Sequence, residues 1–147
     1  MTNFKFKQGD VVLVAFPFTD LSTAKTRPAL VVSSDSFHRE ALDIILAGIT
    51  SQTDRKMTPS DFLLSLEDQR HAGLPKPSLV RLGKIVTLDR RLIRKKLGNM
   101  PPSTLSHLIS ILRHLFSTEP PPEKSQEVRE SPGRYKVGKL RKKSVKK

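Results

Sequence analysis

Short apolar runs separated by turn residues are the feature that most constrains how this 147-residue chain can fold. The runs are rich in Val, Ile and Leu, which is typical of β-strands, and Gly, Asp, Ser and Pro stand between them. They cover Val11–Phe16, Ala29–Val32, Ile44–Ile49 and Leu79–Val86, with a weaker fifth run at Phe62–Leu66. The pattern predicts a compact, mostly antiparallel barrel.

One helical pattern follows these runs. Its apolar residues recur at the spacing of a single helix face, at Leu105, Leu108, Ile109, Leu112 and Leu115. Pro101-Pro102-Ser103 provides a start signal for the helix. The apolar face of such a helix has to cover a sheet face or a barrel mouth. We therefore predict an α+β domain that is mainly β and carries a C-terminal helix.

Basic residues are in large excess, with 27 Lys and Arg against 14 Asp and Glu and a formal net charge of +13. This charge indicates a polyanionic partner, nucleic acid before an acidic protein or a membrane surface. From about Glu119 apolar residues become sparse, the segment opens with Pro120–Pro122, and its end is strongly basic. We expect a folded domain over residues 1–118 and a disordered basic tail over residues 119–147.

Several function classes are excluded by what the sequence lacks. It has no Cys, so it offers no disulfide, no thiol nucleophile and no cysteine-ligated zinc. It has no signal-peptide core and no apolar run near the ~20 residues of a membrane helix, so we expect a soluble, cytoplasmic protein with no membrane partner. The histidines stand at no metal-ligand spacing, and we expect no metal and no cofactor. We place His107 and His114 in the helix and His38 and His71 in loops.

Two short segments carry candidate chemistry. Arg27 stands at the start of an apolar run, where a guanidinium can bind phosphate in a bidentate manner, although on position alone an ordinary surface arginine is the commoner role. Thr50, Ser51 and Gln52 follow another run and can hydrogen-bond a phosphate or ribose oxygen, although local turn hydrogen bonds are the commoner role. Phe16 and Phe18 flank Pro17, and one of them, Phe18 among the candidates, can stack on a base while the other belongs to the core.

These segments together resemble the MazF/PemK toxins. The matching pieces run from about residue 5 to residue 117 and are Gly9–Val14, Thr26–Val32, Ala47–Ser51, Leu79–Arg81, Ile85–Asp89 and the helix after Pro101. The resemblance implies a small SH3-like antiparallel β-barrel that pairs as a homodimer. It also implies a sequence-specific endoribonuclease toxin that cleaves single-stranded RNA by metal-independent attack of a ribose 2′-hydroxyl, and that a cognate antitoxin inhibits.

By the same resemblance, Arg27 and Thr50 become the catalytic pair. RNA binding falls to the loop before Arg27 and to residues near the later strands, namely Phe18, Thr19, Ser22, Lys25, Ser51, Gln52 and Arg81. A guanidinium stays protonated at physiological pH, so we expect Arg27 to act as a charge clamp and leave the general base unassigned. Some relatives carry an acidic residue two positions after the later arginine, where this chain has Gly83.

Two other function classes are compatible with parts of the sequence. One is a non-catalytic poison of DNA gyrase, a mode known in the same superfamily, whose active tail ends in Trp-Gly-Ile. This chain has no Trp and ends in Lys146-Lys147, which argues against that mode. The other is an RNA-binding barrel without chemistry, which would bind RNA whether or not the Thr50 hydroxyl is present.

Overall fold

The computed structural model describes residues 5–16 and 25–118 of the chain. Contacts divide the chain into two units, Met1–Phe116 and Ser117–Lys147. The first unit contains the strands and helices described below, and the second lies almost wholly outside the described residues. The division into a domain and a basic tail at residue 118 therefore stays a prediction.

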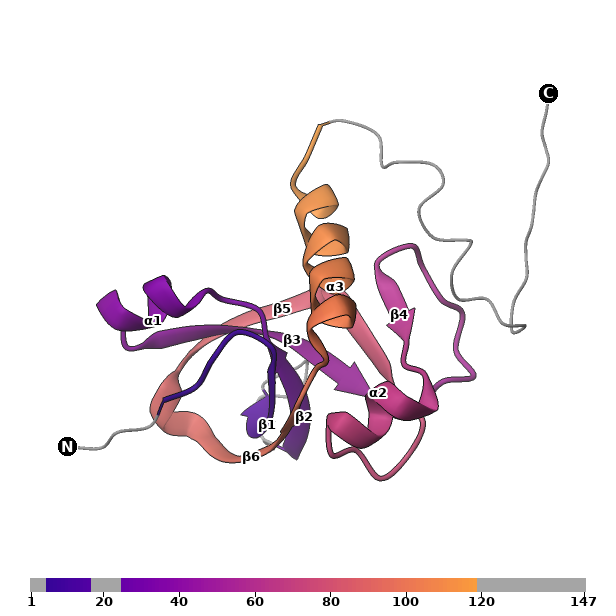
Figure 1. The fold of residues 1–147 in the computed structure, drawn as a ribbon, viewed down its shortest axis with the longest axis horizontal. Helices are drawn as coiled ribbons and strands as arrows, with labels where there is room; N and C mark the ends of the chain where they lie inside the picture. The colour runs from indigo at the N-terminus through magenta and orange to yellow at the C-terminus, as the bar shows by residue number, and fades with distance from the viewer. Residues whose placement is uncertain (1–4, 17–24, 119–147) are drawn as a thin grey trace. The chain divides into compact units, whose positions relative to one another are not determined.

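Six antiparallel strands form one sheet in the order β4-β5-β3-β2-β1-β6. Their bounds are β1 Asp10–Phe16, β2 Lys25–Val31, β3 Asp43–Thr50, β4 Asp61–Leu63, β5 Leu79–Asp89 and β6 Ile93–Asn99. Figure 1 shows that the sheet is strongly curved. Among the described strands, no pairing joins β4 to β6, so these two strands form its edges and the barrel-like sheet is not closed.

The sheet buries apolar side chains on both faces. Residues directly opposite each other in an antiparallel pair point to the same side, so Val11 and Leu30 share one face while Val12 and Ala29 share the other. The first face packs against helix α3 (Pro102–Leu115), whose Leu108 is fully buried. The apolar side chains of the second face form a separate buried cluster, made of Val12, Val14, Ala29, Val31, Ile44 and Leu46.

Two short helices and a 3₁₀ turn connect the strands: α1 Asp35–Glu40, α2 Leu66–His71 and η1 Arg90–Leu92. Both short helices begin at a serine that satisfies an orphan backbone N–H, because the Ser34 Oγ accepts from Phe37 and the Ser65 Oγ accepts from Asp68, each at 3.1 Å. The Thr104 hydroxyl donates to the Asp68 carboxylate at 3.0 Å and ties the start of α3 to α2.

The architecture confirms the predicted fold class, a mainly β domain with a C-terminal helix. The four strong apolar runs all form strands, whereas the weak fifth run gives only Asp61–Leu63 and then a helix. The placement of two histidines in loops was wrong, because His38 lies in α1 and His71 ends α2. Strand β6 and helices α1 and α2 were not predicted at all.

Candidate active site

Polar and charged side chains gather on one face of the sheet where strand β3 ends. Thr50, its last residue, pairs with Leu79 of β5, and two residues earlier Gly48 pairs with Arg81. Arg81 in turn pairs with Asp61 of the edge strand β4. Because opposed residues and every second residue along a strand share a face, Thr50, Arg81 and Asp61 point to the same side of the sheet.

Arg27 approaches this group from the other side of β3. It lies in β2, where it pairs with Val14 of β1. The ladder between β2 and β3 ends with Ala29 opposite Gly48. Arg27 lies two residues beyond Ala29 and Thr50 two residues beyond Gly48, so both side chains belong to the face of that pair. The structure thus brings the predicted catalytic pair to one face of two neighbouring strands, with Arg27 half-buried and Thr50 partly exposed.

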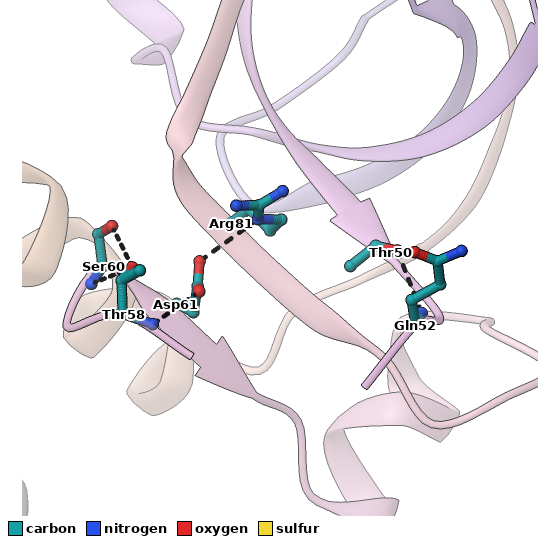
Figure 2. Close-up of polar contacts among 6 residues, drawn as sticks. All are labelled: Thr50, Gln52, Thr58, Ser60, Asp61 and Arg81. Carbon is teal, nitrogen blue, oxygen red and sulfur yellow. Dashed lines mark hydrogen bonds and ion pairs between the residues drawn. The ribbon is translucent and has the colours of Figure 1, made fainter. Parts of the chain in front are cut away.

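The Thr50 hydroxyl already accepts a hydrogen bond within its own turn. Its Oγ1 accepts the backbone N–H of Gln52 at 3.1 Å, as Figure 2 shows. A hydroxyl that accepts one hydrogen bond in this way still has its own proton to donate. The turn after β3 therefore presents Thr50 as a hydrogen-bond donor, which is the role an anionic oxygen requires.

Arg81 and Asp61 form the charged part of this face (Figure 2). The Arg81 Nε lies 3.5 Å from Oδ1 of Asp61, and the exposed fractions of the two side chains are 23% and 2%. The second carboxylate oxygen accepts the Thr58 backbone N–H at 2.9 Å. The carboxylate is thus held from both sides, by a turn of its own segment and by the neighbouring strand.

The other predicted site residues are less constrained. Lys25, at the start of β2, is exposed, as are Ser51 and Gln52 after β3. Three predicted RNA-binding residues lie outside the described residues, namely Phe18, Thr19 and Ser22. Within residues 5–16 and 25–118, no group of three His, Cys, Asp or Glu side chains could hold a metal ion. No helix in the described part of the chain is long and apolar enough to cross a membrane.

Asp61 is the site residue that the sequence reasoning missed. The available signal was Thr58-Pro59-Ser60-Asp61, a turn sequence with an acidic residue directly before the apolar run that becomes β4. Gly83, the position where some relatives carry an acidic residue, lies exposed on β5 with no carboxylate to offer. The carboxylate beside Arg81 comes instead from the adjacent strand.

Residues 7–116 match the family described as "PemK-like, MazF-like toxin of type II toxin-antitoxin system". The match covers most of the chain, so the protein belongs to this family. Endoribonuclease MazF2 of Mycobacterium bovis is 32% identical over 94 residues, which are 63% of this chain and 80% of the relative. Endoribonuclease MazF6 of Mycobacterium tuberculosis matches to the same extent.

Solved structures of similar fold include a mycobacterial endoribonuclease in complex with its cognate antitoxin. Its TM-score is 0.62 at 22% identity, and the match covers 78% of this chain and 98% of that chain. MazF from Deinococcus radiodurans gives a TM-score of 0.61 at 22% identity, with the same coverage of both chains. At this level of identity the likeness shows the fold.

Proposed function

We propose that this protein is an endoribonuclease toxin that cleaves single-stranded RNA at specific sequences, without a metal ion, and that Arg27 and Thr50 act on the scissile phosphate. The observation that carries this proposal is the convergence of Arg27, Thr50 and Arg81 on one face of β2, β3 and β5. Family membership and the names of the relatives support the same activity.

In the proposed reaction the ribose 2′-oxygen attacks the adjacent phosphorus and the bond from phosphorus to the 5′-oxygen breaks. The 2′-hydroxyl loses its proton to a base, which we leave unassigned, and the departing 5′-oxygen gains one. The products are a 2′,3′-cyclic phosphate and a free 5′-hydroxyl. The substrate supplies its own nucleophile, so no water has to be activated. The main requirement is stabilisation of charge on the phosphoryl oxygens.

The described side chains suit this requirement. The guanidinium groups of Arg27 and Arg81 offer positive charge and several N–H donors to phosphoryl oxygens. The Thr50 hydroxyl, with its acceptor side engaged by Gln52, can donate to a further oxygen. The exposed Lys25, Ser51 and Gln52 would contact the flanking nucleotides.

Two partners belong to the proposal. A cognate antitoxin with an acidic, apolar segment would cover the basic site, in line with the complex solved for a mycobacterial relative. A second copy of the chain would complete a homodimer, as the resemblance to the family implies.

The test is cleavage of a long unstructured RNA, with both product ends mapped. We expect Arg27→Ala and Thr50→Val each to lower the rate on the order of 100- to 1000-fold, the usual cost of removing one preorganised donor. Cleavage should persist in the presence of a chelator. RNA with deoxyribose at the cut site should resist cleavage, because it lacks the attacking hydroxyl.

Matched controls are Arg94→Ala on β6 and Thr87→Val on β5, which remove the same groups from exposed positions elsewhere in the sheet. Both should cleave at the rate of the unmodified protein. Full activity in Arg27→Ala, cleavage of the deoxy-substituted RNA, or binding of RNA without any cleavage would each contradict the proposal.

A further inference from the structure

The Asp61 carboxylate is buried, with 2% of its side chain exposed, and a buried ionised group is stable only with partners. One oxygen accepts a hydrogen bond, and the other makes a longer ion-pair contact. Oδ2 accepts the Thr58 backbone N–H at 2.9 Å, and Oδ1 faces the Arg81 Nε at 3.5 Å. The Asp61 backbone N–H also donates to the Thr58 carbonyl at 3.0 Å, so the turn fixes main chain and side chain together. The turn therefore holds the carboxylate in place with Oδ1 directed toward Arg81.

The Arg81 guanidinium is held at one end only. Its Nε lies 3.5 Å from Oδ1 of Asp61 (Figure 2), and the guanidinium carries two further, terminal nitrogens. Within the part of the chain that the structure describes, these terminal nitrogens donate no hydrogen bond to protein. The Arg81 side chain is 23% exposed. A planar guanidinium with free terminal donors is the preferred partner of a phosphate group.

The neighbouring strand places a glycine opposite Arg81. Gly48 of β3 is its direct partner in the ladder and has no side chain. Two residues further along β3, on the same face, Thr50 presents its hydroxyl. The terminal nitrogens of Arg81 and the Thr50 hydroxyl therefore belong to one surface.

We propose that Asp61 is a positioning residue, which orients the Arg81 guanidinium so that its terminal nitrogens bind the same RNA phosphate as Thr50. This inference rests on the proposed endoribonuclease function. A guanidinium fixed in advance loses less conformational entropy when the transition state forms. The smaller entropy cost lowers the barrier of the chemical step and therefore acts mainly on kcat. Asp61 itself touches no substrate and acts only through Arg81.

The key variant is Asp61→Asn, which has nearly the same shape. Its amide oxygen can still accept the Thr58 N–H, but its NH₂ group would then face the Arg81 Nε–H, so two donors meet and the link is lost. We expect kcat to fall on the order of 10- to 100-fold, with a smaller change in KM, because misplacing one group costs rate in this range.

Asp10→Asn is the matched control. Asp10 is also buried, accepts a backbone N–H from three residues earlier, Lys7, and pairs with a cation on the adjacent strand, Lys96. This variant breaks an equivalent ion pair away from the site. Thermal unfolding should therefore shift in both variants, while kcat should fall only in Asp61→Asn.

A double variant separates positioning from a general loss of structure. If Asp61 acts only through Arg81, then Asp61→Asn should cost nothing more once Arg81→Gln is in place, since the two changes remove one interaction. An equal fall in kcat with and without Arg81 would overturn the proposal. An unchanged kcat in Asp61→Asn, or an equal fall in Asp10→Asn, would also overturn it.

A spectroscopic readout keeps this proposal distinct from the proposed function. The Arg81 Nε–H resonance, assigned by its disappearance in Arg81→Gln, should exchange slowly with water in the unmodified protein and rapidly in Asp61→Asn. Absence of RNA cleavage by the unmodified protein would overturn the endoribonuclease function. Rapid exchange of this resonance in the unmodified protein would overturn the positioning role, whether or not RNA is cleaved.

Discussion

The same aspartate turn occurs at two places in the sheet, at the start of β1 and at the start of β4. Asp10 accepts the Lys7 N–H at 2.9 Å and donates its own N–H to the Lys7 carbonyl at 3.0 Å. Asp61 makes the same reciprocal pair with Thr58, at the same two distances. Each carboxylate is buried and faces a cation on the neighbouring strand. The local chemistry of the two turns is therefore alike.

The cations differ, and they give the two turns different roles. Lys96, the partner of Asp10, lies on the edge strand β6 with 48% of its side chain exposed, and a lysine is a flexible point charge. Arg81, the partner of Asp61, is planar, more buried, and shares a face with Thr50. Asp10 links β1 to the edge strand β6 through Lys96. Asp61, we propose, positions a group that binds RNA.

The largest change in stability is expected at the edge strand β6. A Cβ added at Gly98 would lie 2.3 Å from the His71 carbonyl oxygen and 2.6 Å from the Ala72 carbonyl carbon, both in backbone. Gly98→Ala should therefore lower the free energy of unfolding by about 3 kcal/mol in urea titrations, the upper part of the usual range for overpacking.

Gly83→Ala, at the site edge, is the control for this change. There the added Cβ would meet only the Ser60 hydroxyl at 3.3 Å, and that side chain can rotate. Stability should stay within about 0.5 kcal/mol of the unmodified protein. Equal stability of the two variants would show that the backbone at His71 and Ala72 does not lie against Gly98.

Charge-conserving exchanges of the two cations sharpen the comparison. Arg81→Lys keeps the charge but loses the planar fork, so cleavage should slow on the order of 10-fold. Lys96→Arg keeps the charge beside Asp10 at an exposed position, so cleavage and thermal stability should not change. Normal cleavage by Arg81→Lys would mean that charge alone matters at this position, and a slow Lys96→Arg would place β6 in RNA binding.

The smallest effect is a pH dependence at the N-terminal side of the sheet. His38 is half-buried, with Nδ1 2.9 Å from the Phe6 carbonyl oxygen and Nε2 2.6 Å from the Ser33 hydroxyl. Burial lowers the pKa of His38 below its usual 6.5, and Arg90 lowers it as well, although the Phe6 carbonyl and nearby carboxylates oppose this. The neutral ring therefore stabilises the fold above the unfolded pKa, and this contribution is lost as pH falls.

Urea unfolding from pH 7 to pH 5 measures this loss, and His38→Gln should reduce the slope of stability against pH in that range. The control is His71→Gln, which removes an imidazole from the exposed surface of α2. An unchanged slope in His38→Gln would assign the pH dependence to other groups.

Local pattern determined a large part of this protein. The strong apolar runs form strands, and the segment with i, i+3, i+4 spacing from Leu105 forms α3. Both patterns depend only on residues close together in the sequence. The candidate pair Arg27 and Thr50 was also found in the sequence, through its resemblance to a toxin family. The family match confirms that resemblance. The experiments above test the catalytic roles of the pair.

Other features depended on the tertiary structure. Strand β6 carries Arg94, Lys95 and Lys96 in a row, so it has no apolar run, and pairing with β1 makes it a strand. Helix α1 buries none of its residues, so it shows no apolar face in the sequence. Asp61 and Arg81 are separated by a helix and meet only through the pairing of β4 with β5. Strand order and register are set by contacts between distant residues, and no short window of sequence contains them.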